Sequence, residues 1–415
     1  MSSKRKTNNL KTNISHNDLI NEISNLKDDV NKLKDEINSL HKEIKLLKSY
    51  HSNHTNINND INDYEQKNNN KNIININEEI KKKKNNDPTK IELLYDLTKD
   101  SYSDYYFDNS FYVYKSINEI NYLIYSTKNK SLINYNLNKE KKEIEIKNAH
   151  DKYITNFRYY NDNNNKKEII MSISSRNNNI KLWNICNWEC LININNINSN
   201  GEIYSACFLN YQNNNYIVTS NYNESNSDPI KIFDFKGKKI KEINQSDDDT
   251  FYIDAFYDKI HYLITCNGNY VKSYDYNNNR LYHRYYEYYN NSNHLNSIVY
   301  NNNENNNEMI KLIETCEDGF IRVWNFHSGS IINRIDIGCK GLACICLWNI
   351  NYIFVGDENK YIKLINLKSG KIIKCLTGHK KGGITIKKIN HPKYGECIVS
   401  KGQYEDQIKI WINKV

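Results

Sequence analysis

Cysteine and histidine are the residues of this chain best suited to metal binding or nucleophilic chemistry. The 415-residue sequence contains 10 cysteines and 11 histidines. The tightest groups are Cys186/Cys190 and Cys339/Cys344/Cys346, and neither contains a Cys-x-x-Cys pair or precedes a histidine pair with zinc-site spacing. Most cysteines stand among apolar residues, where a thiol behaves as a small buried hydrophobic group. The spacing indicates structural cysteines and predicts neither a metal nor a cofactor.

Two further segments carry chemically versatile side chains. The carboxylates of Asp247–Asp249 are adjacent, but they lack the oxygen-ligand spacing of a calcium loop. The aromatic and basic segment Leu281–Tyr289 could stack nucleic-acid bases, although we favour a half-exposed strand, which tyrosine also suits. No motif of a serine hydrolase, a zinc protease or a nucleotide-binding loop is present. We therefore expect a protein that is not an enzyme.

The charge is moderately basic and spread along the chain. With 57 basic and 49 acidic residues the net charge is +8, which alone does not argue for binding to nucleic acid. The run Lys81–Lys84 is interpreted as part of a solvated linker, with a nuclear localisation signal as the alternative. Neither a signal peptide nor an apolar stretch of about 18 residues is present. These features predict a cytoplasmic protein without a transmembrane segment, and a nuclear location is possible.

Apolar residues near the amino terminus recur at alternating steps of four and three, the period of a coiled coil. β-branched residues at the a positions and leucine at the d positions favour two parallel strands. Acidic residues at g and mostly basic residues at e agree with this pairing, and a single amphipathic helix packed on the rest of the chain is the alternative. We predict a homodimeric coiled coil over residues 16–50, after a disordered tail over 1–15. Its dimerisation residues are Leu19, Ile23, Leu26, Val30, Leu33, Ile37, Leu40, Ile44 and Leu47.

Residues 51–90 are rich in Asn and Lys and contain too few apolar residues to build a core. The segment is predicted to be a low-complexity, disordered linker.

After residue 90 the hydrophobic period drops to two residues and stays there, and short apolar runs alternate with polar clusters, which indicates an all-β structure. One phrase recurs: Ile180–Asn184 reads IKLWN and Ile321–Asn325 reads IRVWN, with five looser copies. The steps between the aromatic or equivalent positions are 48, 50, 41, 50, 41 and 46 residues. This regular spacing predicts seven structural repeats. The equivalent positions are Tyr135, Trp183, Phe233, Tyr274, Trp324, Ile365 and Trp411.

These repeats resemble the WD-repeat family over residues 91–415. Gly378-His379 stands where the Gly-His of that family opens a repeat, Ala149-His150 is a weaker version, and Asp318 lies in a predicted tight turn. Most repeats lack Gly-His, Asn often replaces Asp after the Trp, and no repeat is identified with the complete His–Asp–Ser/Thr–Trp set of the family. The resemblance implies an all-β, seven-bladed β-propeller that follows the α-helical coiled coil and the linker in the sequence.

The end of the sequence bears on how such a ring closes. Only Ile412–Val415 follow Trp411, too few residues for another strand. We predict that a segment within 91–107, such as Ile91–Leu97, supplies the missing outer strand. The Asn runs at 161–166, 213–215, 221–228 and 301–308 predict enlarged loops. Because the chain has only 14 Gly, we also expect Asn to replace Gly in some turns.

A propeller that follows a coiled coil in the sequence predicts a scaffold for protein–protein interaction. Proteins or peptides are expected to bind one propeller face, the one that carries the loops between outer and inner strands, near His150, Asp318 and His379. The same order of segments resembles autophagy adaptors that recruit conjugation machinery to membranes. It also resembles nuclear corepressors, and a nucleic-acid-associated scaffold is a further alternative. Architecture alone does not choose among them.

Overall fold

The computed structural model describes residues 87–101, 111–162, 167–195, 197, 201–222, 229–244, 250–268, 270–287, 293–300 and 309–413. The predicted tail, coiled coil and most of the linker lie outside these residues, as do Lys81–Lys84 and Asp247–Asp249. The predictions made for those segments stay predictions.

The described residues form seven antiparallel sheets of four strands each, which we call blades 1–7. Two short 3-10 helices, Pro88–Lys90 and Ser175–Asn177, accompany them. Blades 1–3 contain β2 (Phe111–Lys115), β3 (Asn121–Ser126), β4 (Leu132–Asn136) and β5 (Lys141–Ile146); β6 (Asn156–Asp162), β7 (Lys167–Ser174), β8 (Asn179–Asn184) and β9 (Cys190–Ile194); and β10 (Glu202–Tyr211), β11 (Asn214–Tyr222), β12 (Ile230–Asp234) and β13 (Lys239–Ile243). Blades 4–6 contain β14 (Thr250–Asp258), β15 (Ile260–Asn267), β16 (Val271–Asp275) and β17 (Arg280–Tyr285); β18 (His294–Tyr300), β19 (Lys311–Cys316), β20 (Phe320–Asn325) and β21 (Ile331–Asp336); and β22 (Leu342–Asn349), β23 (Tyr352–Asp357), β24 (Ile362–Asn366) and β25 (Ile372–Leu376). Blade 7 contains β26 (Thr385–His391), β27 (Gly395–Lys401), β28 (Ile408–Asn413) and β1 (Ile91–Asp96).

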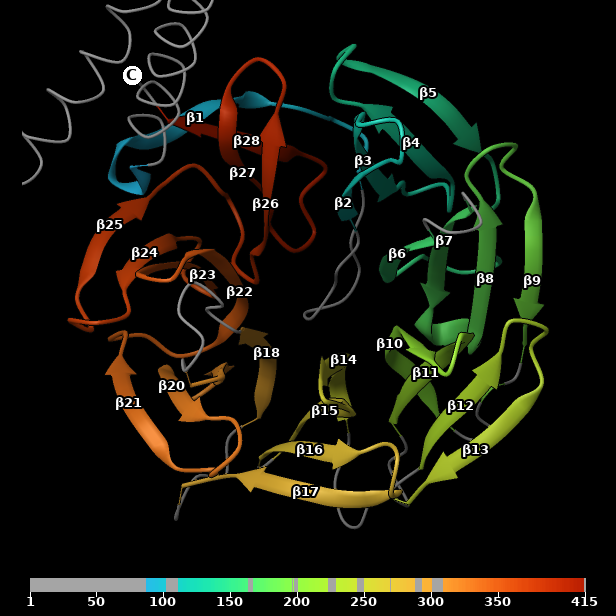
Figure 1. Ribbon diagram of the computed structural model, residues 1–415. Coiled ribbons are helices and arrows are strands. Elements are labelled where there is room, and N and C mark those ends of the chain that lie inside the picture. Colours follow the sequence, from blue (N-terminus) through green and yellow to red (C-terminus); the bar gives the residue numbers. More distant parts are fainter. Residues whose placement is uncertain are drawn as a thin grey trace, which may run out of the picture. The chain divides into compact units, whose positions relative to one another are not determined.

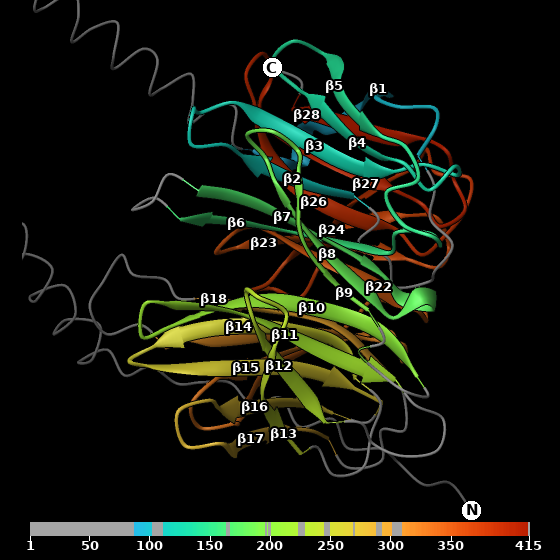
Figure 2. The same ribbon diagram turned by 90° about the vertical axis from the view of Figure 1, so that its right-hand side faces the viewer.

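The blades follow one another around a common axis, as the colours of Figure 1 show, so the all-β, seven-bladed propeller is confirmed. The first strand of each blade lies nearest the axis and the fourth lies at the rim. Figure 2 shows the blades from the side, with the connecting loops gathered at opposite ends of the strands.

The ring closes through β1, as predicted. β1 pairs antiparallel with β28, in a register that places Ile91 opposite Asn413 and Leu93 opposite Trp411. Ile91 is fully buried and packs in a cluster with Trp411. Closure therefore joins two segments that lie more than 300 residues apart in the sequence.

Burial of the strands depends on their distance from the axis. The second strands have runs of consecutive buried residues, as in Ile169–Ser174 and Ile353–Asp357, because neighbouring blades cover both of their faces. Outer strands such as β9 and β25 expose most of their residues. The predicted alternation of buried and exposed residues is therefore absent from these second strands, where buried residues are consecutive. Seven apolar clusters share the core, each spanning two neighbouring blades.

Asn and Asp organise the turns between third and fourth strands. Their side-chain oxygens accept backbone N–H bonds two to four residues later, which an amide oxygen does as well as a carboxylate. This explains why Asn replaces Asp after the Trp-equivalent position. The residues are Asn136, Asn184, Asp234, Asp275, Asn325 and Asn366.

The expectation about left-handed turns holds only in part. Among described non-Gly residues, twelve have positive φ, and only four of them are Asn. Lys, Glu, Gln, Trp and Tyr occupy the rest. The expected enlarged loop at 213–215 is wrong, because β10 and β11 are joined by the two-residue turn Gln212–Asn213.

Candidate functional site

A chain of buried hydrogen bonds crosses blade 7. His379 lies in the loop before β26, Ser400 on β27 and Trp411 on β28. The Nε2 atom of His379 lies 2.7 Å from Oγ of Ser400, and the indole N–H of Trp411 donates to the same oxygen over 2.6 Å. On the other side of the ring, Nδ1 of His379 lies 2.6 Å from Oε2 of Glu405. Blade 7 thus holds a complete His–acid–Ser–Trp set, with Glu405 as the acid.

Glu405 also binds the loop that carries His379. Its Oε1 accepts hydrogen bonds from the backbone N–H groups of Lys380 and Lys381. Burial opposes the charged carboxylate, but the hydrogen bond and charge of His379 and these two amides outweigh it and lower the pKa of Glu405. The carboxylate therefore fastens the turn between β27 and β28 to the loop between β25 and β26.

Ser400, His379 and Glu405 have the connectivity of a catalytic triad, in which a histidine links a serine to an acid. A nucleophile must also reach its substrate, and Ser400 is fully buried with Trp411 donating to its oxygen. His379 and Glu405 are buried as well. The arrangement therefore acts as a structural clamp.

Blade 2 repeats part of this chain. Nε2 of His150 lies 2.7 Å from Oγ of Ser172, and the indole N–H of Trp183 donates to that oxygen over 2.8 Å. Burial, assisted by the nearby charge of Lys181, lowers the pKa of His150 to about 3. His150 is therefore a neutral structural residue near neutral pH.

Asp318 has a different partner in blade 5. It accepts the N–H of Phe320 over 3.0 Å and pairs with Arg322, which also binds Glu287 at 2.8 Å. Arg322 is almost fully buried. Asp318 thus holds its own turn and the start of β20.

A cation follows the first residue of the recurring phrase in six of the seven repeats. Lys181 donates to the carbonyl of Ala149 over 2.7 Å, and Lys231 donates to that of Ile197 over 3.0 Å. Each of these two cations fastens the loop that leads into its own blade. The six residues are Lys181, Lys231, Lys272, Arg322, Lys363 and Lys409.

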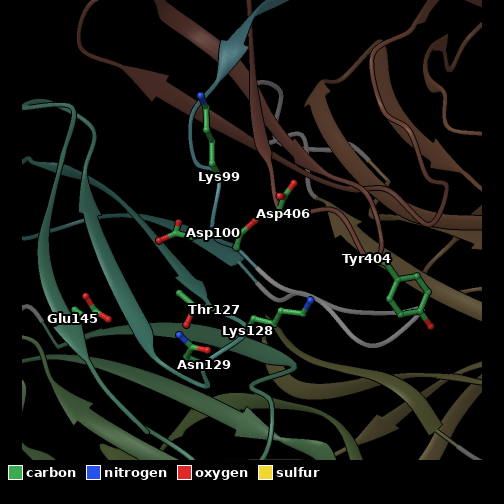
Figure 3. A pocket seen from close by; sticks show the side chains of 9 residues that line it. Lys99, Asp100, Thr127, Lys128, Asn129, Glu145, Tyr404 and Asp406 are labelled. Carbon is green, nitrogen blue, oxygen red and sulfur yellow. The ribbon is translucent and has the colours of Figure 1, made fainter.

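A hollow of about 470 Å³ opens between blade 7 and blade 1, on the face where outer strands connect to inner ones. We call it the Tyr404 pocket. In the view of Figure 3, Tyr404 and Glu145 stand on opposite sides of the hollow. Its lining residues are Lys99, Asp100, Ser101, Thr127, Lys128, Asn129, Glu145, Tyr404 and Asp406.

Tyr404 has an unusual backbone for an aromatic residue. Its φ is +56°, in the left-handed region that disfavours side chains with a Cβ. The side chain is 58% exposed, so burial of the ring does not compensate for this conformation. The adjacent Glu405 is fixed by the blade 7 clamp, and the N–H of Gln403 donates to the carbonyl of Gly382 over 3.0 Å. The clamp therefore holds Tyr404 at the pocket rim.

Carboxylates in the pocket differ in their partners. Asp100 accepts the hydroxyl of Tyr125 over 3.0 Å and pairs with Lys142. Within the described part of the chain, the side chains of Glu145 and Asp406 form no ion pair or hydrogen bond. The buried hydroxyl of Ser101 also finds no partner among the described residues. These polar groups are available to a bound ligand.

The remaining sequence-predicted residues lie apart from the pocket. The seven Trp-equivalent positions all fall on third strands, and Leu281–Tyr285 lies in the outer strand β17, as the favoured interpretation required. Six cysteines are buried and all ten are free. Across the described ranges, no group of three or more His, Cys, Asp or Glu side chains is placed to hold a metal ion.

Sequence reasoning missed Glu405 and Tyr404. A signal for Glu405 existed, since it precedes Trp411 by six residues, as Asp318 precedes Trp324. Nothing local marks Tyr404, because its position depends on a clamp between two separate strand connections.

No protein-family model matches this chain, and no curated protein matches it at a significant level. No helix in the described residues is long and apolar enough to cross a bilayer.

Proposed function

We propose that this chain is a non-catalytic scaffold of the WD-repeat type that binds a segment of a partner protein in the Tyr404 pocket. β-Propellers commonly serve as protein-interaction scaffolds. The observation that carries the proposal is the exposed Tyr404, held in a costly backbone conformation at the pocket rim by a buried clamp. Strained residues of this kind cluster at binding sites.

The WD-repeat assignment is supported by two features together. Seven repeats carry the recurring phrase on their third strands, and blade 7 joins His379, Ser400 and Trp411 in one hydrogen-bonded chain. Glu405 completes the set in place of the Asp of that family.

The pocket favours a partner segment with a basic side chain. The carboxylates of Glu145 and Asp406 are free of described partners, and Tyr404 offers an aromatic face. A guanidinium or ammonium group placed against such a ring and near carboxylates gains cation–π and charge-assisted hydrogen-bond energy.

The heptads of residues 16–50 extend the proposal to a homodimer that presents two propellers. Two linked pockets would bind a partner with two copies of the segment more tightly than one pocket would, through effective concentration. The cytoplasm is the proposed location. The autophagy-adaptor, corepressor and nucleic-acid alternatives remain compatible with the order of segments, and the proposal does not depend on choosing among them.

The test is affinity capture with the full chain, its Tyr404→Ala and Asp406→Asn variants, and Tyr257→Ala as the control. Tyr257 is comparably exposed, at 63%, but stands at the end of β14. We expect specific proteins to be lost with both pocket variants and retained with the control. An unchanged set of captured proteins would exclude the Tyr404 pocket as the binding site. Deleting residues 16–50 should halve the mass in sedimentation and reduce capture without abolishing it.

A further inference from the structure

The inner strands bring a set of charged residues together around the propeller axis. In each blade, the third residue of the recurring phrase, which stands immediately before the Trp-equivalent, pairs with one residue of the second strand. That residue in turn pairs with one residue of the first, innermost strand. We call these seven aligned residues the axial ring. In order around the axis they are Tyr112, Arg158, Cys207, Asp254, Ile298, Cys346 and Lys387.

The ring holds two cations and one carboxylate. Lys387 of β26 and Arg158 of β6 flank Tyr112 of β2, and Asp254 lies on β14 across the axis (Figure 1). The Nζ atom of Lys387 lies 5.8 Å from the centre of the Tyr112 ring. The guanidinium carbon of Arg158 lies 5.7 Å from the centre of the Tyr252 ring. Asp254 is exposed and Lys387 is only half-buried, so water reaches this level of the axis.

Neither cation forms a close ion pair, although the charge of Asp254 acts to raise the pKa of both. In the described ranges no carboxylate lies within 4 Å of Arg158 or Lys387. Arg158 donates to neutral oxygens only: Oδ1 of Asn156 at 2.6 Å, the carbonyl of Phe157 at 3.0 Å and Oγ of Ser205 at 3.4 Å. Asp254 instead accepts the hydroxyl of Tyr252 at 3.0 Å and the N–H of Ala255 at 2.9 Å.

Lys387 has no hydrogen-bond acceptor among the described residues. Desolvation and the charge of Arg158 lower its pKa. The like charges of Arg158 and Lys387 repel each other, and an anion bound between them would relieve this repulsion. A guanidinium, an ammonium and phenol hydroxyls are donors that together suit an oxyanion.

We propose that the axial ring is a binding site for a phosphate group, held by Arg158 and Lys387 and assisted by the hydroxyl of Tyr112. The phosphate can be a free ion or a phosphomonoester of a small molecule. This site is separate from the Tyr404 pocket and does not depend on the proposed scaffold function.

The test is isothermal titration of the full chain with sodium orthophosphate and, separately, with inositol hexakisphosphate, at constant ionic strength. We expect saturable binding that Lys387→Met weakens at least tenfold and Lys387→Arg largely restores. Lys393→Met, which removes an exposed lysine from the turn after β26, should bind like the parent chain. Binding of orthophosphate assigns the site to the free ion, whereas binding of the hexakisphosphate alone assigns it to phosphomonoesters.

Three outcomes would overturn the proposal. These are no binding of either probe, equal binding by the parent chain and the Lys387→Met variant, and tighter binding of acetate than of both phosphates. The melting temperature of each variant without ligand shows whether it is folded. If Lys387→Met does not fold, Arg158→Lys serves as the second variant. It keeps the charge but removes the planar donor pair, and should weaken phosphate binding several-fold.

Discussion

The imidazole of His379 and the carboxylate of Glu405 lie 2.6 Å apart, although 26 positions separate them in the sequence. His379 precedes the first strand of blade 7, and Glu405 lies in the turn between its second and third strands. The contact fixes two loops of one propeller face and thereby sets the position of Tyr404 at the pocket rim.

Replacing Glu405 with Gln should destabilise the propeller by roughly 2–4 kcal/mol, because the amide loses the charge that His379 and the loop amides stabilise. Chemical denaturation of the purified chain measures this loss. Glu358→Gln is the control, since Glu358 is exposed on the corresponding loop of blade 6. Equal stability of the two variants would show that the clamp contributes nothing to folding.

Ile91→Ala should cost about 2–4 kcal/mol, the usual effect of deleting a fully buried aliphatic side chain. Leu94→Ala on the same strand should cost less, about 1 kcal/mol, because Leu94 is 37% exposed. Removal of all residues before 111 should lower the melting temperature sharply, since β28 would lose its partner. Unchanged thermal unfolding would contradict closure of the ring through β1.

Acid should weaken the propeller through His150. Its pKa falls from 6.5 when unfolded to about 3 when folded, so between these values only the unfolded chain binds the proton. The free energy of unfolding therefore has its full value above pH 6.5 and decreases as the pH falls. At pH 5 proton uptake by unfolded His150 lowers it by about 2 kcal/mol. Denaturation midpoints at pH 7.5 and 5 should therefore differ less in His150→Gln than in the parent chain. A variant with the same pH dependence as the parent would show that His150 is not the titrating group.

Tyr404→Gly should be about 0.5–1 kcal/mol more stable than Tyr404→Ala, because both remove the ring but only glycine adopts positive φ without strain. Thermal unfolding of the two variants makes the comparison. If alanine proves the more stable replacement, the backbone at 404 is not left-handed.

Local sequence patterns were sufficient for much of the architecture. The recurring phrase predicted seven repeats because each blade must place the same apolar residues on its third strand, and the short segment after Trp411 predicted closure by Ile91–Leu97. Residues 281–285 of the aromatic segment lie in the outer strand β17, as favoured. The strand period was less well predicted, because two-sided burial removes alternation from second strands such as β7.

The sequence by itself determined the number of repeats, the strand that closes the ring and the positions of the Trp-equivalent residues, since these follow from short-range patterns and their spacing. Only the tertiary structure decided that Glu405 is the acid of the blade 7 clamp, that Tyr404 is held outward in a left-handed conformation, and that Arg158 and Lys387 occupy aligned positions on two inner strands. Each of these relationships joins residues of different loops or blades. Their distances are set by packing around a common axis, which leaves no local signature in the chain.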